Sequence, residues 1–417
     1  MKRTWLLTAG LLLAASPLRA QVSFDGFLQG LFGGRIDDKN PTSTEQPASE
    51  TRFQLRAQHF GDGAEFFGRL DFVFDGADSV DYDWELREGW MKFHLGDNFD
   101  FKVGRQILTW GTGDLIFIND VFAKDYRSFF VGRDDQYLKA PQNAIRIEYY
   151  NPLGNLNVVW TPRFEPDRLP TGRRLSYFNP MAGTIVGTGM GDQFFSEPPL
   201  PESKFENGEL AMRFNRYLGG FNTALYFYRG FYKDPLGFDP GAGTPFYPRL
   251  NVYGASVRGA LWGGVLWVEG GFLDSRDDTH GNNPYIVNSS ATSLLGFERQ
   301  IATDLTANIQ WQVDWMLDYD TYAAQQPPGM FVRDEVRHLL TSRVTKLLDQ
   351  ELITLSAFVF YSPSDEDMYA RLYTSYKYTD EVTLAAGANI FTGRHENTVF
   401  GQFQKNDNVY LKLTYGF

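Results

Sequence analysis

The last nine residues of the chain alternate between apolar and polar side chains without a fault. Val409, Leu411, Leu413, Tyr415 and Phe417 fall on one face of a strand, and the residues between them fall on the other. A strand of this kind needs a hydrogen-bonding partner along each edge and an apolar medium against one face. The closing strand of a membrane β-barrel meets both needs, so the sequence predicts one.

The aromatic end of this strand also carries a resemblance. Tyr415 and Phe417 resemble the C-terminal signal that outer-membrane barrels of Gram-negative bacteria present to their assembly machinery. The resemblance implies an assembly signal at these two residues. It also implies that the partners include the barrel-assembly machinery and the lipid and lipopolysaccharide of the outer membrane.

The N-terminus predicts an exported protein. Lys2 and Arg3 precede an apolar stretch over residues 5–15, and residues 18–20 offer a cleavage site before Gln21. Because this stretch is far shorter than the roughly 20 residues that span a bilayer as a helix, we interpret it as a cleaved signal peptide.

Composition excludes a helical membrane protein and favours a large all-β one. The mean hydropathy is −0.34, and after the signal no apolar run approaches the length of a transmembrane helix. Aromatic residues make up 16% of the chain, which has 41 glycines and no cysteine, so a disulfide scaffold is excluded. We expect a signal peptide over residues 1–20 and one outer-membrane β-barrel domain over 21–417. By length alone a soluble β-sandwich pair or propeller stays open, but no repeat supports a propeller.

Short alternating segments recur along the whole chain. Eighteen of them are predicted as strands, and a barrel of 16 strands is the alternative. The predicted strands cover residues 22–34, 51–60, 64–75, 83–95, 99–110, 143–150, 155–161, 207–217, 221–232, 250–261, 264–274, 291–300, 304–316, 335–347, 351–362, 368–378, 382–391 and 405–417.

Connections between these segments are alternately short and mostly long. The short ones are rich in turn formers, as in Gly61-Asp62-Gly63, Gly96-Asp97-Asn98 and Leu218-Gly219-Gly220. Tight periplasmic turns and long outer loops give an outer-membrane barrel this rhythm. We therefore predict a transmembrane antiparallel β-barrel of about 18 strands, closed by pairing residues 405–417 with 22–34.

Basic residues keep to one face of the predicted strands. Over residues 305–315, Ile309 and Trp311 lie on an uncharged apolar face, whereas Asn308 and Gln310 lie on an amide-rich one. An Arg or Lys that faced lipid at mid-membrane would cost about 2–4 kcal/mol, so the polar faces are assigned inward. The predicted pore-lining residues are Arg52, Arg56, Arg69, Lys102, Arg105, Arg146, Arg213, Arg258, Arg337, Arg343, Arg371 and Lys377.

The alternation breaks in two places. Across residues 83–95 the apolar face changes parity, which predicts a bulge near Glu88-Gly89. In the next strand an unbroken pattern would place Arg105 in lipid, so we expect a second bulge at Gly104 that turns Arg105 inward.

Residues 111–142 form the connection best suited to set selectivity. Loops of this length are usually functional or disordered, and its four phenylalanines argue against disorder because they need a packing partner. In many porins the third loop folds into the lumen and narrows it, and this loop resembles them in position and length. An ordered outer cap that stays outside the pore is the alternative. The predicted constriction residues are Asp114, Asp120, Asp125, Arg127, Arg133 and Asp134.

The following long connection, residues 162–206, also concentrates positive charge. It carries Arg168, Arg173 and Arg174, and three prolines stiffen its exit. We predict a mobile surface loop here.

One motif is specific enough to suggest a family. Gly104-Arg105-Gln106 followed by Trp110-Gly111 resembles the G-R-Q-x-x-x-W-G strand of a poorly characterised family of proteobacterial outer-membrane porin-like proteins, distantly similar to alginate-export and phosphate-selective porins. Residues 387–391 to 417 resemble its closing hairpin. The likeness covers about a third of the chain and implies a channel without naming its cargo.

Signals for catalysis are absent from the sequence. The histidines have no metal-ligand spacing, and no G-x-S-x-G elbow occurs, so neither an enzyme nor a cofactor or metal site is predicted. The histidines are His59, His94, His280, His338 and His395.

These observations predict a channel for diffusion of a small polar or anionic solute. One alternative is an outer-membrane component of a transport system for a lipid, polymer or hydrophobic compound, suggested by the aromatic loops. Another is a structural or adhesion barrel plugged by its own loops. No nucleic-acid partner is expected, and the oligomeric state stays open, with a homotrimer as one outcome.

Overall fold

A computed structural model of the chain describes residues 22–37, 39–61, 63–77, 81–189, 198–326 and 331–417. The predicted signal peptide, residues 1–20, lies outside the described residues.

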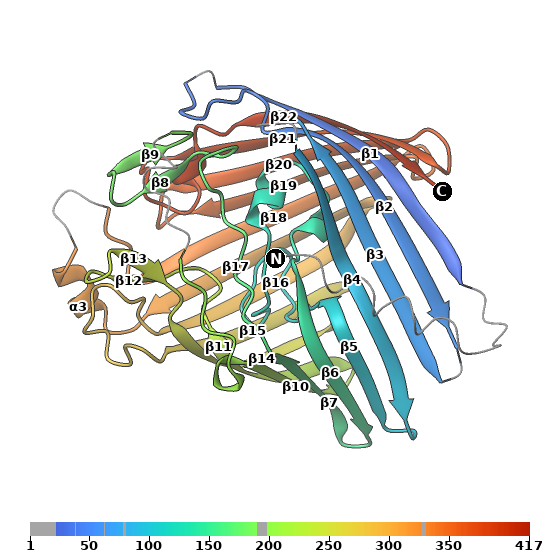
Figure 1. Cartoon of the computed structure of the whole chain (residues 1–417), viewed down its shortest axis with the longest axis horizontal. Coiled ribbons are helices and arrows are strands. Elements are labelled where there is room, and N and C mark those ends of the chain that lie inside the picture. Colours follow the sequence, from blue (N-terminus) through green and yellow to red (C-terminus); the bar gives the residue numbers. More distant parts are fainter. Residues whose placement is uncertain (1–21, 38, 62, 78–80, 190–197, 327–330) are drawn as a thin grey trace.

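Eighteen antiparallel strands form one closed sheet, which confirms the predicted barrel and its strand count (Figure 1). The wall strands are β1 Ser23–Arg35, β2 Ala48–Phe60, β3 Ala64–Asp75, β4 Asp81–Leu95, β5 Phe99–Ile107, β6 Pro141–Asn151, β7 Gly154–Thr161, β10 Glu209–Leu218, β11 Phe221–Phe231, β14 Arg249–Leu261, β15 Gly264–Ser275, β16 Ser290–Ala302, β17 Leu305–Met316, β18 Val336–Leu348, β19 Ile353–Ser362, β20 Asp367–Lys377, β21 Val382–Gly393 and β22 Asn408–Gly416.

The first and last strands close the barrel, as predicted. β1 pairs with β22 from Phe27 opposite Gly416 to Arg35 opposite Asn408. Phe417 extends the pairing, because its carbonyl oxygen accepts a hydrogen bond from the Gly26 amide and its own amide donates back to the Gly26 carbonyl. Because of this pairing, neither the first nor the last strand is an open edge.

The two ends of the barrel differ in their connections. At one end, here called the turn end, strands join through tight turns such as Leu261 to Gly264, where Trp262 and Gly263 both have positive φ as a two-residue hairpin turn requires. Long connections gather at the other end, the loop end (Figure 1). The smaller elements are α1 Tyr126–Phe130, η2 Asp135–Tyr137, β8 Tyr177–Asn179, β9 Thr184–Val186, η3 Phe205–Asn207, β12 Gly237–Asp239, β13 Thr244–Phe246, α3 Tyr319–Ala324 and η4 Gly401–Phe403.

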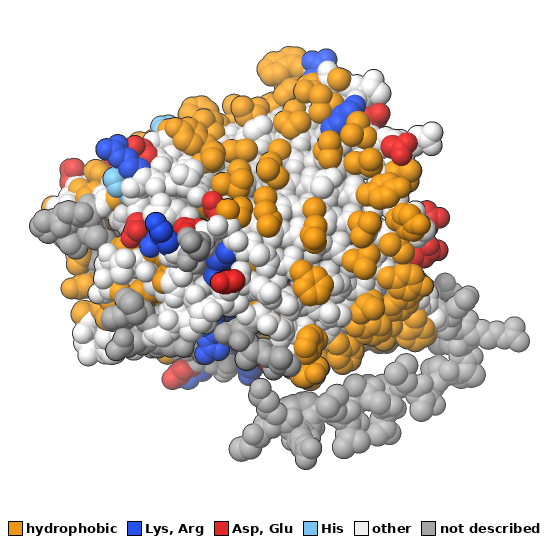
Figure 2. Space-filling view, turned by 90° about the horizontal axis from the view of Figure 1, so that it is seen from above, with side chains coloured by type: hydrophobic (Ala, Val, Ile, Leu, Met, Phe, Trp, Pro, Cys, Tyr) orange, Lys and Arg blue, Asp and Glu red, His pale blue; other side chains and the backbone are white. Residues whose placement is uncertain are grey.

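The outer surface of the wall is apolar. Alternate residues of the strands, such as Leu411 and Leu413 of β22 or Ile309 and Trp311 of β17, are exposed hydrophobic side chains. Figure 2 shows one face of the wall, where hydrophobic side chains gather over the strands and charged ones lie mainly toward the margins. Such a surface suits lipid. Within the described ranges, no helix is long and apolar enough to cross a membrane.

The bulge predicted in β4 is present, one residue from its expected position. Arg69 of β3 lies opposite Glu88, but the next residue, Leu70, lies opposite Leu86, so Arg87 is the extra residue. The bulge restores the apolar face to the outside on both sides of the shift.

The second predicted bulge, at Gly104, is wrong. The register of β5 runs past Gly104 without a shift against both β4 and β6. The glycine is needed for another reason: its φ is +127°, and a Cβ there would lie 2.3 Å from the Gly89 carbonyl oxygen. Arg105 therefore keeps the outward register position of its strand.

Candidate functional site

The segment between β5 and β6, residues 108–140, lies inside the barrel and is called the inner loop below (Figure 1). Asn119 donates to Glu269 of β15 at 2.9 Å. Asp134 accepts from Lys412 of β22, and Tyr137 is hydrogen-bonded to Gln54 of β2 at 3.1 Å. A segment can reach strands on such separate parts of the wall only by crossing the interior.

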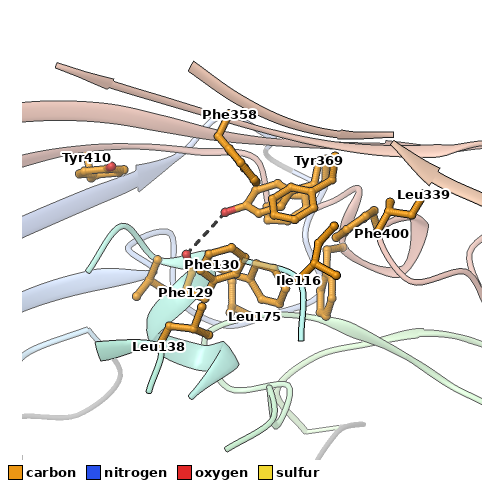
Figure 3. Close-up of a cluster of buried hydrophobic side chains, with 14 of the residues drawn as sticks. Ile116, Phe129, Phe130, Leu138, Leu175, Leu339, Phe358, Tyr369, Phe400 and Tyr410 are labelled. Carbon is orange, nitrogen blue, oxygen red and sulfur yellow. Dashed lines mark hydrogen bonds between the residues drawn. The ribbon is translucent and has the colours of Figure 1, made fainter. Parts of the chain in front are cut away.

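Aromatic packing holds the middle of the inner loop against one side of the wall (Figure 3). The rings of Phe129 and Phe130 lie 5.6 and 5.4 Å from that of Tyr369 in edge-on geometry. The Tyr369 hydroxyl donates to the Phe129 carbonyl oxygen at 3.5 Å, and Phe391 stacks on the same tyrosine with centroids 4.4 Å apart. These contacts supply the packing partner that the loop phenylalanines require.

Acidic side chains of the inner loop bind cations of the wall. Asp114 accepts from Arg343 Nη2 at 3.0 Å and from Asn308 at 2.9 Å. Asp135 accepts from Arg371 at 2.7 Å. Together with the pair formed by Asp134, these contacts join the loop to β17, β18, β20 and β22.

Arg133 of the inner loop makes a forked contact with the wall. Its Nε and Nη2 atoms donate to both carboxylate oxygens of Glu50 on β2, at 2.6 to 3.1 Å, and its Nη1 donates to Ser128 at 2.8 Å. Glu50 is only 2% exposed. A forked contact of this kind fixes orientation as well as charge.

Asp120 and Asp125, the other predicted acids, shape the loop from within. Asp120 accepts from Lys124 Nζ at 3.0 Å and from Thr109 at 2.8 Å. Asp125 caps α1 by accepting from the Ser128 amide at 2.9 Å. Both residues therefore have structural partners.

Arg127 lines a cavity of about 370 Å³ between the inner loop, β3, β4 and residues 168–175. We call it the arginine cavity. Six guanidinium groups and five carboxylates line it: Arg52, Arg127, Arg133, Arg168, Arg173 and Arg174 with Asp75, Asp81, Asp83, Glu85 and Asp125.

Three arginines of this cavity come from a connection for which we predicted a mobile surface loop. The Arg168 amide donates to the Lys124 carbonyl oxygen at 2.8 Å, and its carbonyl accepts from the Arg127 amide at 3.2 Å. Leu175 is buried in the aromatic cluster of the inner loop. The first part of the 162–206 connection thus packs onto the inner loop. Its concentration of arginine was visible in the sequence, but its contact with a segment 40 residues away was not.

Of the twelve predicted pore-lining cations, all but Arg105 occupy inward register positions of their strands. Several are held by carboxylates. Arg52 binds Asp71 at 2.6 Å, and Arg337 binds Asp365 of an outer connection. The others with such partners are Arg56, Arg69, Arg146, Arg343 and Arg371.

A second group of inward cations has no carboxylate within ion-pair distance among the described residues. Lys102 lies 3.8 Å from the Trp90 ring centre, Arg213 lies 5.8 Å from that of Tyr226, and Lys377 ends β20. Arg258 donates to the Thr112 carbonyl oxygen at 3.3 Å. These four cations therefore have no carboxylate to release before they could contact a passing ion, and their role in solute passage stays a prediction.

No cluster of three His, Asp or Glu side chains that could hold a metal ion is found in the part of the chain that the structure describes.

No protein-family model matches the chain, and no curated protein sequence does either. Solved structures do match. OccD3 (OpdP) of Pseudomonas aeruginosa has a TM-score of 0.55 at 11% identity, over 95% of this chain and 91% of that one. OccAB3 of Acinetobacter baumannii also has a TM-score of 0.55, at 10% identity, over 95% and 99%.

The chain is a transmembrane β-barrel. At these identities the likeness shows the shared fold alone. The resemblance to the G-R-Q-x-x-x-W-G family stays a prediction, since no family model matches.

Proposed function

We propose that the protein is a porin-type channel of the outer membrane, through which small polar solutes, and anionic ones in preference, diffuse. The arginine cavity beside the inner loop carries this proposal. Guanidinium groups bind carboxylate and phosphate through paired N–H donors. Six of them around one cavity make a site for an anion rather than for a cation, although five carboxylates moderate the field.

Within the cavity, Arg127 is the guanidinium most available to a solute. It forms no ion pair among the described residues, whereas Arg52, Arg133, Arg168 and Arg174 each bind a carboxylate. An arginine without a partner can exchange water for an anion without first breaking a protein contact.

The inner wall extends this basic character toward the turn end. Lys102 and Arg258 lie four residues from the tight turns of their strands, and Arg213 lies six residues from its turn. Arg258 also contacts the inner loop at Thr112. A solute that passed the loop would therefore meet further unpaired cations. The apolar outer surface and the terminal aromatic residues Tyr415 and Phe417 support an outer-membrane location, with the turn end facing the periplasm.

Reversal potentials across a planar bilayer test the anion preference. In a potassium chloride gradient, the wild-type channel is expected to pass chloride better than potassium. The double variant Arg213→Gln/Arg258→Gln removes two unpaired inward cations and is expected to shift the reversal potential toward that of an unselective pore. Arg216→Gln is the matched control, since Arg216 lies on the same strand as Arg213 but is exposed on the outer face. An equal reversal potential in all three proteins would refute the role of these cations.

A further inference from the structure

In the described part of the chain, the strand pairing of the wall is incomplete beside β4. β3 pairs with β4 along its whole length, from Asp75 opposite Asp81. β5 pairs with β4 only from Leu95 back to Gly89, and then leaves the wall as the inner loop. Among the described residues, no strand pairs with the free edge of residues 81–88. An open sheet edge is not tolerated against lipid unless it lines a polar or water-filled space.

Side chains, rather than a neighbouring strand, close this opening, which we call the wall gap. Arg105 Nε donates to the Leu86 carbonyl oxygen at 2.8 Å. Arg168 binds Glu85, and Arg105 also binds Glu165 at 3.1 Å. A closure of this kind can open by rotamer changes, without breaking a β-ladder.

Cavities lie on both sides of the closure. The arginine cavity is on the lumen side. A second cavity of about 410 Å³, the wall cavity, is lined by Arg105, Asn143, Arg163, Phe164, Arg168 and Leu200 among others. Arg168 lines both cavities. Its two ion pairs, with Glu85 and with Asp125 at 3.3 Å, therefore form the partition between them.

The chemistry around the wall gap is divided between charge and apolar surface. Arg163 is exposed and forms no ion pair within the described residues. On the other flank, Tyr82, Trp84 and Leu86 of β4 are 76%, 59% and 41% exposed. They occupy the outward positions of a strand whose outer face meets lipid. A ligand that satisfies both sides has an anionic head and an apolar body.

We propose that the wall gap is a lateral portal that binds an anionic amphiphile with a single apolar chain, holding its head at Arg163 and Arg168 and its chain along β4. The volume of the wall cavity lies at the low end of small-molecule sites, which favours one chain over a two-chain lipid. The portal joins the membrane to the lumen through the wall, so it does not depend on the axial channel proposed above.

Photolabelling of the full protein in liposomes tests the site. The probe is hexadecanoate carrying a diazirine near the chain end, and hexadecanol with the same group is the uncharged comparison. We expect the carboxylate to label residues 81–88, along which its chain lies, at least five times more than the alcohol does. Arg163→Gln is expected to remove most of this excess, whereas Arg216→Gln is not. Equal labelling by acid and alcohol, or equal labelling by a two-chain phosphatidylglycerol probe, would overturn the proposal.

A cross-link tests the route. Since the chain has no cysteine, Leu86→Cys/Glu165→Cys with a short bis-methanethiosulfonate reagent ties the two sides of the gap together. The lock is expected to abolish labelling of the inner loop by the membrane-borne carboxylate, and unchanged inner-loop labelling would contradict the route. Conductance separates the two proposals. An Arg163→Gln variant that loses labelling but still passes ionic current supports the portal. A wild-type protein that is labelled at the site but passes no current refutes the channel proposal alone.

Discussion

The ion pair between Arg133 and Glu50 shows how one contact can set the position of the inner loop. Glu50 belongs to the wall and is almost fully buried, while Arg133 belongs to the loop. Each charge compensates the desolvation of the other. Glu50 has one further ion pair, a longer contact with Arg52 at 3.4 Å.

Removing one member of this pair should therefore cost more than removing both. Arg133→Gln is expected to lower the free energy of unfolding by up to about 3–5 kcal/mol, because Glu50 stays buried with only the longer contact to Arg52. In Glu50→Gln/Arg133→Gln two neutral amides face each other, so a smaller loss is expected. Urea unfolding followed by tryptophan fluorescence in lipid vesicles measures both. Equal losses in the single and double variants would show that the pair is not coupled.

Gly104 lies too close to the neighbouring strand for any other residue to replace it without a shift of the backbone. Gly104→Ala adds a Cβ 2.3 Å from the Gly89 carbonyl oxygen at a φ that L-residues rarely adopt, so the ladder between β4 and β5 must shift. A loss of at least about 2 kcal/mol is expected in the same unfolding assay. Gly34→Ala is the control, because no atom lies within 4 Å of its Cβ. Two variants of equal stability would contradict the close approach.

At the scale of elements, the strands were predictable and the contacts of the loops were not. The range 64–75 is correct at both ends, and the range 382–391 misses the end of β21 by two residues. Lipid on one side and water on the other force a period of two along every strand, so alternation alone locates them. Nothing comparable acts on a loop. Arg168 enters the site through contacts with Glu85 and Asp125, which lie 83 and 43 residues away.

The same limit applies to the candidate site. The inward position of Arg337 follows from the alternation of its strand. Its pairing with Asp365 of an outer connection does not follow from the sequence. The error at Gly104 has a related cause. A bulge was expected because an arginine cannot face lipid, yet Arg105 reaches a wall gap that only the tertiary structure reveals.

The carboxyl groups of Asp167 and Asp234 lie in two connections at the loop end, and Asp167 also contacts the inner loop. Their pKa values predict that the contact between the two carboxyls depends on pH. Asp167 accepts from the Lys124 amide at 2.6 Å and lies within hydrogen-bonding reach of Asp234. Burial, and then the charge of Asp234, raise the pKa of Asp167 well above its ordinary value despite Lys124 and Lys233 nearby. Burial raises the pKa of Asp234 to about 6.

Both carboxyls have a raised pKa, so their contact is stabilised by protonation. It is complete below the ordinary carboxyl pKa near 4 and weakens as the pH rises through about 6. A dye on a single cysteine at Thr171 is therefore expected to show lower anisotropy at pH 8 than at pH 5. Asp234→Asn, which stays neutral, is expected to remove most of this difference, while Asp320→Asn in another outer connection leaves it intact. A lower anisotropy at pH 5 than at pH 8 would contradict this prediction.

At the scale of the whole molecule, the inner loop divides the barrel unequally. Its aromatic side and its acids are attached to the wall from β15 round to β2, whereas the arginine cavity remains between the loop, β3 and β4. The molecule is therefore a barrel narrowed by an attached loop, with basic groups around the remaining space and the wall gap beside it. A plugged structural barrel would share the fold but would carry no current.

Single-channel conductance with and without the inner loop tests whether the loop narrows an open channel. Residues 112–136 are replaced by a short Gly-Ser linker, and both proteins are reconstituted in the same planar bilayer after their folded state is verified by gel mobility. Steady ohmic steps are expected from the wild type, and steps several times larger, with weaker anion preference, are expected from the replacement. Silence from the correctly folded wild type, or identical steps from both proteins, would contradict this expectation.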